Sequence, residues 1–246
     1  MSDYKIGIIV EGTTDRIIIE SALNHIFQDQ CYTMIQLQPE RSFQHGGFGF
    51  TGTGWGGVYR WCRQVVEMGL EMSENPSLQK FDIIIIHLDA DVAEKRYSDA
   101  NILDPIKDDL PCVLPCPPAS NTTKNLEQVV INWLKLSGQT FKPLVMCIPS
   151  KCTEAWVAAA LYGQKDNSIL VELECRSDIE NYLVQKPARE RFIRNRNGKM
   201  KKLTKRYSEY SEQITKKWNY IVEQCTQAKQ FNDRIVALKL SKHETG

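Results

Sequence analysis

Acidic residues follow two apolar segments of the sequence, in positions where they could share a metal ion. Glu11 stands directly after the first segment, and Asp15 comes four residues later. Asp89 and Asp91 stand directly after the second segment. Oxygen ligands from several carboxylates suit hard cations such as Mg²⁺ or Mn²⁺. The pattern therefore favours metal-assisted chemistry on phosphate groups.

The two apolar segments are typical of buried strands in an open parallel sheet, whose carboxyl ends meet at one edge. Asp89 and Asp91 would point to the same side if the backbone stays extended after the strand. Gly12 would permit a tight turn or a positive φ before Asp15. Simpler explanations also exist, because acids are common at helix N-termini and in Asp-rich turns.

The elements that must position these acids alternate between strands and helices. Apolar runs predict strands at 6–10, 31–37, 81–88, 111–114 and 144–148, and helical spacing predicts helices at 14–27, 58–72, 121–136 and 153–162. Such alternation predicts an α/β fold with a mainly parallel sheet and helices on both faces. We expect a catalytic domain at 1–163 and a helical, basic C-terminal region at 164–246.

Composition places the chain among globular proteins with a sizeable core. Of its 246 residues, 42% are hydrophobic and 25% charged. The apolar runs are too short to span a bilayer, and the first residues enter a strand almost at once, which predicts a cytoplasmic protein without membrane contact. In that compartment the 8 cysteines should be small, reduced side chains. Their spacing does not fit a zinc site.

Charge is distributed unevenly along the chain. Residues 1–185 hold 15 Lys and Arg against 24 Asp and Glu, a formal charge of −9, whereas residues 186–246 hold 16 against 6, a charge of +10. A basic segment interleaved with aromatic residues predicts phosphate binding, although a solvated helical face explains the charge equally well. The candidate nucleic-acid-binding residues are Arg189, Arg191, Arg194, Arg196, Lys199, Lys201, Lys202, Lys205 and Arg206.

A glycine-rich segment at 46–57 holds seven of the 14 glycines. It is not a P-loop, because no Gly-Lys-Ser/Thr follows. Phe48, Phe50 and Trp55 could stack on bases, but an ordinary surface loop is the favoured interpretation. His45 and His87 are interpreted as structural, with His87 a core group inside its strand.

The acidic motifs, taken together, resemble those of the Toprim domain. Val10-Glu11-Gly12-Thr13-Thr14-Asp15, followed later by an apolar strand and Asp89-Ala90-Asp91, is similar to that family's Glu and Asp-x-Asp signature over about residues 5–160. The family includes topoisomerases, bacterial primases, OLD-type nucleases, the 5S rRNA maturase and the small Toprim subunits of ATPase-plus-Toprim anti-phage systems such as PARIS.

The resemblance implies roles for each acid. Glu11 would be a general base or metal ligand, Asp89 and Asp91 would bind Mg²⁺ or Mn²⁺, and Asp15 would serve a second metal as in OLD-like nucleases. Glu154 begins a helix similar to the Glu-x-Trp start of small Toprim-like proteins, although a helix-capping role is also open. Lys151 could neutralise a transition-state oxyanion or simply be solvated.

The resemblance thus implies a metal-dependent endonuclease acting on RNA or DNA, plausibly an anti-phage effector. Because the sequence contains no Walker motif, an ATPase partner subunit is suspected, and a homodimer is possible. Two alternatives remain open. One is an acidic-pocket phosphatase or phosphotransfer domain with Asp89 as nucleophile, which its late Asp-x-Asp position disfavours. The other is a non-catalytic module that binds nucleic acid or a partner.

Overall fold

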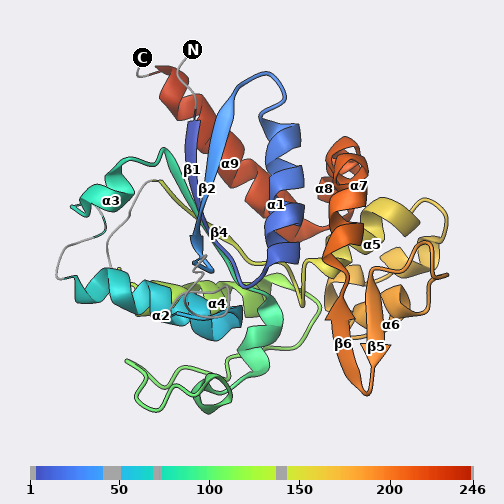
Figure 1. The fold of residues 1–246 in the computed structure, drawn as a ribbon, viewed down its shortest axis with the longest axis horizontal. Coiled ribbons are helices and arrows are strands. Elements are labelled where there is room, and N and C mark those ends of the chain that lie inside the picture. Colours follow the sequence, from blue (N-terminus) through green and yellow to red (C-terminus); the bar gives the residue numbers. More distant parts are fainter. Residues whose placement is uncertain (1–3, 41–50, 69–71, 73, 137–142, 245–246) are drawn as a thin grey trace.

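A four-stranded parallel sheet forms the centre of the protein (Figure 1). The computed structural model describes residues 4–40, 51–68, 72, 74–136 and 143–244. The strands are β1 (Tyr4–Ile9), β2 (Tyr32–Gln38), β3 (Ile83–His87) and β4 (Leu144–Cys147), and they lie in the order β2-β1-β3-β4. Because β1 and β3 are neighbours, the residues that follow them meet at the same sheet edge.

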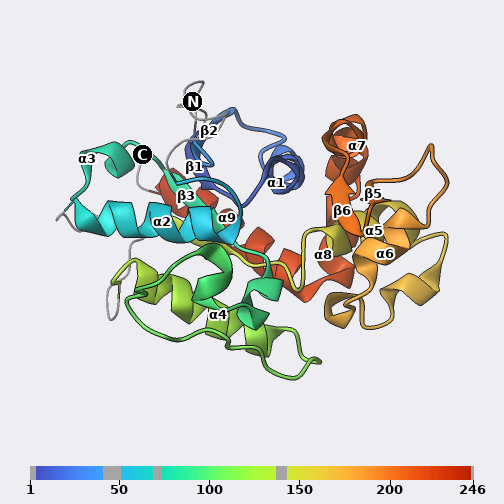
Figure 2. The ribbon, with the colours of Figure 1, turned by 60° about the horizontal axis from the view of Figure 1, so that its bottom comes forward.

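Helices cover both faces of this sheet, as the alternating pattern predicts (Figures 1 and 2). One face carries α1 (Thr13–Ile26) and α9 (Thr226–Glu244), and beside the sheet α5 (Glu154–Tyr162), α7 (Thr204–Lys216) and α8 (Trp218–Gln224) extend the same core. The other face carries α2 (Gly54–Glu67) and α4 (Ser120–Trp133), with the short α3 (Pro76–Gln79) beyond them. The predicted α/β fold class is therefore confirmed.

The central strand β3 shows why the sheet is buried on both sides. Ile83 and Ile85 point into the core beneath α1, whereas Ile84 and Ile86 point into the core beneath α2 and α4. All four are essentially inaccessible to solvent. Full burial of one such side chain stabilises a fold by about 1.5–3 kcal/mol. A continuous apolar run is thus the natural sequence for this position.

Some predicted elements differ in the structure. Residues 111–114 form no strand, and Cys112 within them instead donates its backbone N–H to Ala93 O at 2.8 Å. The helix expected at 58–72 begins earlier, at Gly54, and so includes Trp55, whose ring lies 6.5 Å from that of Trp133. Phe48, Phe50 and His45 lie outside the described residues.

The C-terminal third contains a hairpin that the helical expectation did not include. Its strands are β5 (Ile193–Arg196) and β6 (Lys199–Lys202), paired antiparallel, and α6 (Ile179–Val184) lies beside them. Short 3₁₀ helices complete the chain: η1 (Ala90–Glu94), η2 (Tyr97–Ala100), η3 (Asn167–Leu170) and η4 (Leu173–Cys175).

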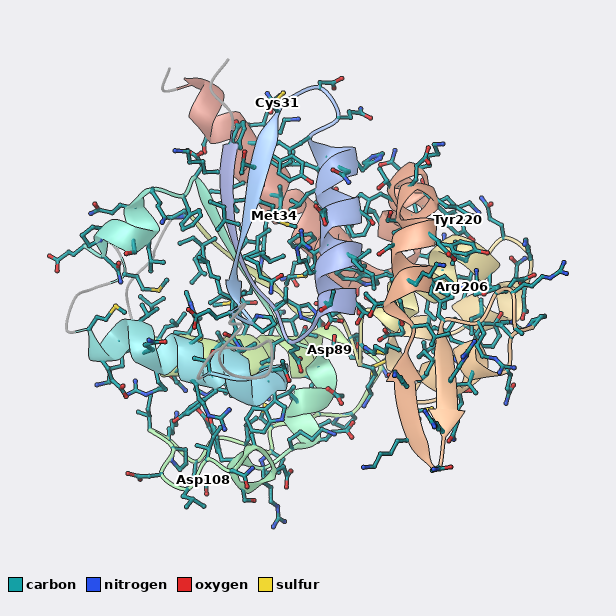
Figure 3. The ribbon with its side chains drawn as sticks, viewed as in Figure 1. Cys31, Met34, Asp89, Asp108, Arg206 and Tyr220 are labelled. Atoms are coloured by element: carbon teal, nitrogen blue, oxygen red, sulfur yellow. A yellow bond between two sulfur atoms is a disulfide. The ribbon has the colours of Figure 1, made fainter. Side chains whose placement is uncertain are left out.

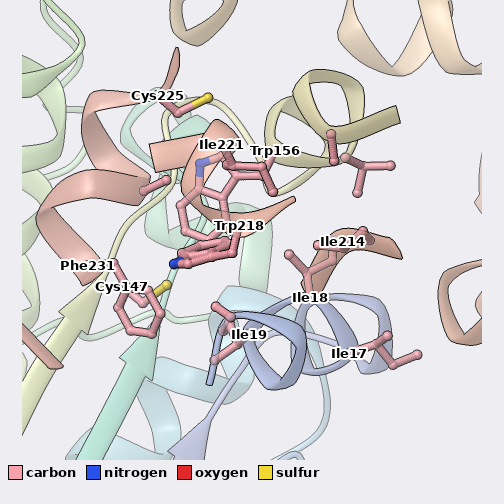
Figure 4. Packing of buried hydrophobic residues seen from close by; sticks show 14 of the residues in the cluster. Ile17, Ile18, Ile19, Cys147, Trp156, Ile214, Trp218, Ile221, Cys225 and Phe231 are labelled. Carbon is pink, nitrogen blue, oxygen red and sulfur yellow. The ribbon is translucent and has the colours of Figure 1, made fainter. Parts of the chain in front are cut away.

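The C-terminal helices share their core with the sheet. Trp156 of α5 packs edge-to-face on Trp218 of α8, with ring centroids 5.5 Å apart, and stacks on Phe231 of α9 (Figure 4). Ile18 and Ile19 of α1 belong to the same cluster. Side chains from both sides of residue 163 therefore stabilise one another.

The cysteines only partly follow the expectation of reduced side chains. Cys116 and Cys175 form a disulfide that joins the segment before α4 to η4, with Cα atoms 5.5 Å apart. The six remaining cysteines are free.

Among the described helices, none combines the length and the apolar character needed to cross a bilayer.

Candidate metal centre

Three potential metal ligands meet where β1 and β3 end. One donor atom from each of Glu11, His87 and Asp89 can be chosen so that all three atoms lie within 4.8 Å of one another. Glu11 is fixed by a hydrogen bond, because its Oε1 accepts the backbone N–H of Asp89 at 2.7 Å. Figure 3 shows Asp89 at the carboxyl end of the strands, beside the start of α1. The sheet topology thus brings Glu11 beside residues that come 76 and 78 positions later in the chain.

His87 is the most unusual member of this group. Its side chain is fully buried, and neither ring nitrogen has a hydrogen-bond partner among the described residues. The Nε2 atom lies 3.2 Å from Oδ1 of Asp89, close enough for an electrostatic contact but without hydrogen-bond alignment. Buried polar atoms are normally satisfied, so an imidazole that contacts Asp89 without an aligned hydrogen bond makes this group a candidate ligand site.

The alternation of β3 explains how His87 reaches the acids. Ile83 and Ile85 face α1, and His87 and Asp89 continue this two-residue period on the same side. The sequence predicted Asp89 and Asp91 as the pair that points to one side. In the structure the pair with this spacing is His87 and Asp89. At Ala90 the backbone enters η1, and Asp91 is not part of the group formed by Glu11, His87 and Asp89.

Thr153 connects the acids of different elements. Its backbone N–H donates to Oδ1 of Asp89 at 3.2 Å, and its hydroxyl donates to Oδ1 of Asp15 at 2.8 Å. The segment after β4 reaches this position because backbone bonds continue past the strand ends, from Ala90 N to Pro149 O at 3.1 Å. Thr153 therefore positions two carboxylates and does not merely cap α5.

Asp15 is buried at the start of α1, as its spacing from Glu11 predicts. Gly12 has an extended backbone, with φ at −153°, so a positive φ is not the reason for glycine here. A Cβ atom at Gly12 would lie 3.3 Å from Oδ2 of Asp15. The glycine leaves room for that carboxylate.

Protonation shows how crowded the negative charges are. Burial and the charge of Asp89 raise the pKa of Glu11 well above its usual value. Burial and the charge of Asp15 raise the pKa of Asp89 to about 6. Burial opposes protonation of His87, but the surrounding carboxylates, Asp89 foremost, outweigh it and raise the His87 pKa to about 9. The group thus requires protons or a cation.

Glu154 lies beside Asp15, and each of its carboxylate oxygens is bound by another side chain of the protein. Its side chain is fully buried, and its two oxygens accept from Tyr207 Oη and Lys202 Nζ, both at 2.7 Å. The Nζ atom of Lys202 also lies 3.9 Å from Oδ1 of Asp15. The structure therefore gives Glu154 protein partners on both oxygens.

Asp91 and Lys151 lie at the margin of the site. Asp91 is paired with Lys95 at 3.4 Å, and its side chain is 47% exposed. Lys151 is paired with Glu94. The backbone O of Lys151 accepts the N–H of Asp91 at 3.2 Å. Lys151 therefore lies next to the acidic group, but its ammonium pairs with Glu94 outside it.

The basic residues predicted to bind nucleic acid divide into several groups. Lys202 points inward to Glu154, and Lys205 and Arg206 at the start of α7 pair with Glu209. Arg191 donates to the backbone O of Lys186 at 3.1 Å. Arg189 is exposed before the hairpin. The other four, Arg194, Arg196, Lys199 and Lys201, lie on the hairpin and are exposed.

These four hairpin residues form what we name the basic face. Arg194 lies opposite Lys201, and Arg196 lies opposite Lys199. Because side chains alternate along strands, all four project from one side, while buried Ile193 marks the opposite side. Like charges opposite one another are destabilising, and within the described part of the chain no carboxylate pairs with them.

Comparison of the sequence and structure with protein-family profiles, curated proteins and solved structures gave no match. The case for function therefore depends on the site itself. Sequence reasoning did not identify His87, Thr153, Lys202 or Tyr207 as members of it. Only His87 left a usable signal, its two-residue spacing from Asp89.

Proposed function

We propose that this chain is a metal-dependent nuclease that hydrolyses phosphodiester bonds of RNA or DNA. The observation that carries the proposal is the buried imidazole of His87, which has no hydrogen-bond partner and lies beside Glu11 and Asp89. Acids alone are common at sheet edges. A buried imidazole among carboxylates whose ring nitrogens have no hydrogen-bond partner is not, because leaving a buried polar group unsatisfied costs free energy.

Glu11, His87 and Asp89 fit a divalent ion in their chemistry. Two carboxylates suit Mg²⁺ and Mn²⁺, and the imidazole shifts the preference toward Mn²⁺. A divalent ion held there supplies Lewis acidity at a phosphoryl group. In the metal-free protein, protons neutralise part of the same charge, so metal binding should release protons.

The basic face supplies a binding surface for the polyanion. Its four exposed cations can bind the phosphate backbone of a nucleic acid, which is a partner of opposite charge. The hairpin adjoins the acids through its other side, where Lys202 at the end of β6 contacts Glu154. No pattern on this face reads base edges, so we expect recognition of shape or backbone.

The order of the acids along the sheet supports the Toprim resemblance as part of this proposal. The Glu follows β1 and the Asp-x-Asp segment follows the adjacent β3. An anti-phage role, an ATPase partner subunit and a homodimer are further parts of the proposal that rest on the resemblance alone.

A cleavage assay tests the proposed activity. Purified protein would be incubated with tRNA, plasmid DNA and single-stranded DNA, with EDTA, Mg²⁺ or Mn²⁺. We expect metal-dependent cleavage that falls by orders of magnitude in Glu11→Gln and Asp89→Asn. Glu20→Gln is the control, because Glu20 lies on α1 but pairs outside the site with Arg16. Equal cleavage in all variants would reject this site.

Metal binding without cleavage would support the non-catalytic alternative. A complex of beryllofluoride with the Asp89 carboxylate, which mimics an acyl phosphate, would instead support a phosphotransfer domain. Each alternative thus has its own positive result.

A further inference from the structure

We infer that the ammonium group of Lys202 takes the place of a second divalent ion, so that the site holds one metal ion per chain. The inference rests on the metal centre proposed above. The sequence placed Asp15 and Glu154 among the catalytic acids and Lys202 among the nucleic-acid contacts. In the structure the three side chains form one arrangement.

The geometry places Lys202 between two buried carboxylates. Its Nζ lies 2.7 Å from Oε2 of Glu154 and 3.9 Å from Oδ1 of Asp15. Thr153 then links Asp15 to Asp89 through its hydroxyl and its backbone N–H. The acids therefore have the Lys202 ammonium on one side and, on the other side, the His87 imidazole, whose ring nitrogens have no hydrogen-bond partner.

A second metal ion and this ammonium group exclude each other. Mg²⁺ binds oxygens at about 2.0–2.1 Å and demands near-octahedral geometry. An ion using the same oxygens of Glu154 and Asp15 would meet the ammonium at short range, with no ligand between two positive charges. The charge balance is consistent with one metal ion. One divalent ion and the ammonium of Lys202 together offset three of the four negative charges, which belong to Glu11, Asp15, Asp89 and Glu154.

The surroundings hold Lys202 in this place. It is the last residue of β6 and lies opposite buried Ile193 of β5. Glu154 is fully buried, so withdrawing the ammonium would leave a buried charge without its cation. Tyr207 fixes the other oxygen of Glu154. The ammonium is thus a built-in part of the fold.

The test is the number of Mn²⁺ ions bound by the full-length protein, measured by calorimetry and by electron paramagnetic resonance of free Mn²⁺. We expect one ion for the wild type and for Lys201→Ala, whose side chain lies on the basic face. We expect two ions for Lys202→Ala, with the second bound at least tenfold more tightly than any second ion in the wild type. Lys202→Gln, which can still donate a hydrogen bond to Glu154, is the second variant and should also bind two.

Two ions in the wild type, or one in folded Lys202→Ala and Lys202→Gln, would overturn the inference. If neither variant folds, the wild-type number decides alone, with one ion supporting the inference. A wild type that binds no ion would reject the metal centre itself, so the two failures are distinguishable.

Discussion

The hydroxyl group of Tyr207 offers the sharpest test of how the buried acids are stabilised. It donates to Oε1 of Glu154 at 2.7 Å, and both side chains are fully buried. Burial and the charge of Glu154 raise the pKa of Tyr207 well above its usual value, so the phenol keeps its proton. Tyr207→Phe removes the donor and little else. A hydrogen bond to a charged group contributes about 1.5–3 kcal/mol.

We therefore expect Tyr207→Phe to lower the free energy of unfolding by about 2 kcal/mol, or the Tm by roughly 4–8 °C. Urea denaturation followed by tryptophan fluorescence measures it. Tyr210→Phe is the matched control, because both rings lie 5.2 Å from that of Phe192, and the Tyr210 hydroxyl makes no hydrogen bond to a described residue. The control should lose less than about 0.5 kcal/mol. Equal losses would refute the argument.

The remaining predictions concern metal, pH and salt. Mn²⁺ at 100 times its Kd should stabilise the protein by about 2.7 kcal/mol in thermal melts, and Glu11→Gln should abolish the effect while Glu20→Gln keeps it. The Asp89 pKa is raised from 3.8 to about 6, so the metal-free fold binds a proton more tightly than the unfolded chain. The free energy of unfolding should therefore increase as the pH falls from about 6 towards 4. This extra stability should disappear as the pH rises above about 6. Asp89→Asn should flatten that slope, which is at most about 1.4 kcal/mol per pH unit for one proton; an unchanged slope would contradict the assignment. Arg194→Ala with Lys201→Ala should reduce the salt slope of RNA or DNA binding by about 0.7–0.9 per lost contact, whereas Lys216→Ala on α7 should not.

The fold was readable because its main signals are local. Continuous apolar runs such as 81–88 require burial on both faces, and helical spacing between them leaves few arrangements other than a parallel sheet. The hairpin was missed because Arg194–Lys202 is almost entirely polar. Its strands are held by Ile193 and by the Lys202–Glu154 contact, which are tertiary interactions.

The site was readable only in part, for the same reason. Glu11 and Asp89 could be placed because each follows a strand, and strand order makes them neighbours. Asp91 could not, since the extended backbone ends at Asp89 and a 3₁₀ turn begins. Lys202 lies 187 positions after Asp15, and no spacing rule connects such residues. The charge of Lys202 predicted an exposed position, but its contacts with the buried carboxylates of Glu154 and Asp15 hold it in the site.

The most direct test of the central claim is a crystal structure with Mn²⁺, with the ion located by anomalous scattering. We predict one anomalous peak per chain, within about 2.0–2.3 Å of a carboxylate oxygen of Glu11, one of Asp89 and a ring nitrogen of His87. A crystal grown in Mn²⁺ that shows no peak between these three side chains would contradict the account.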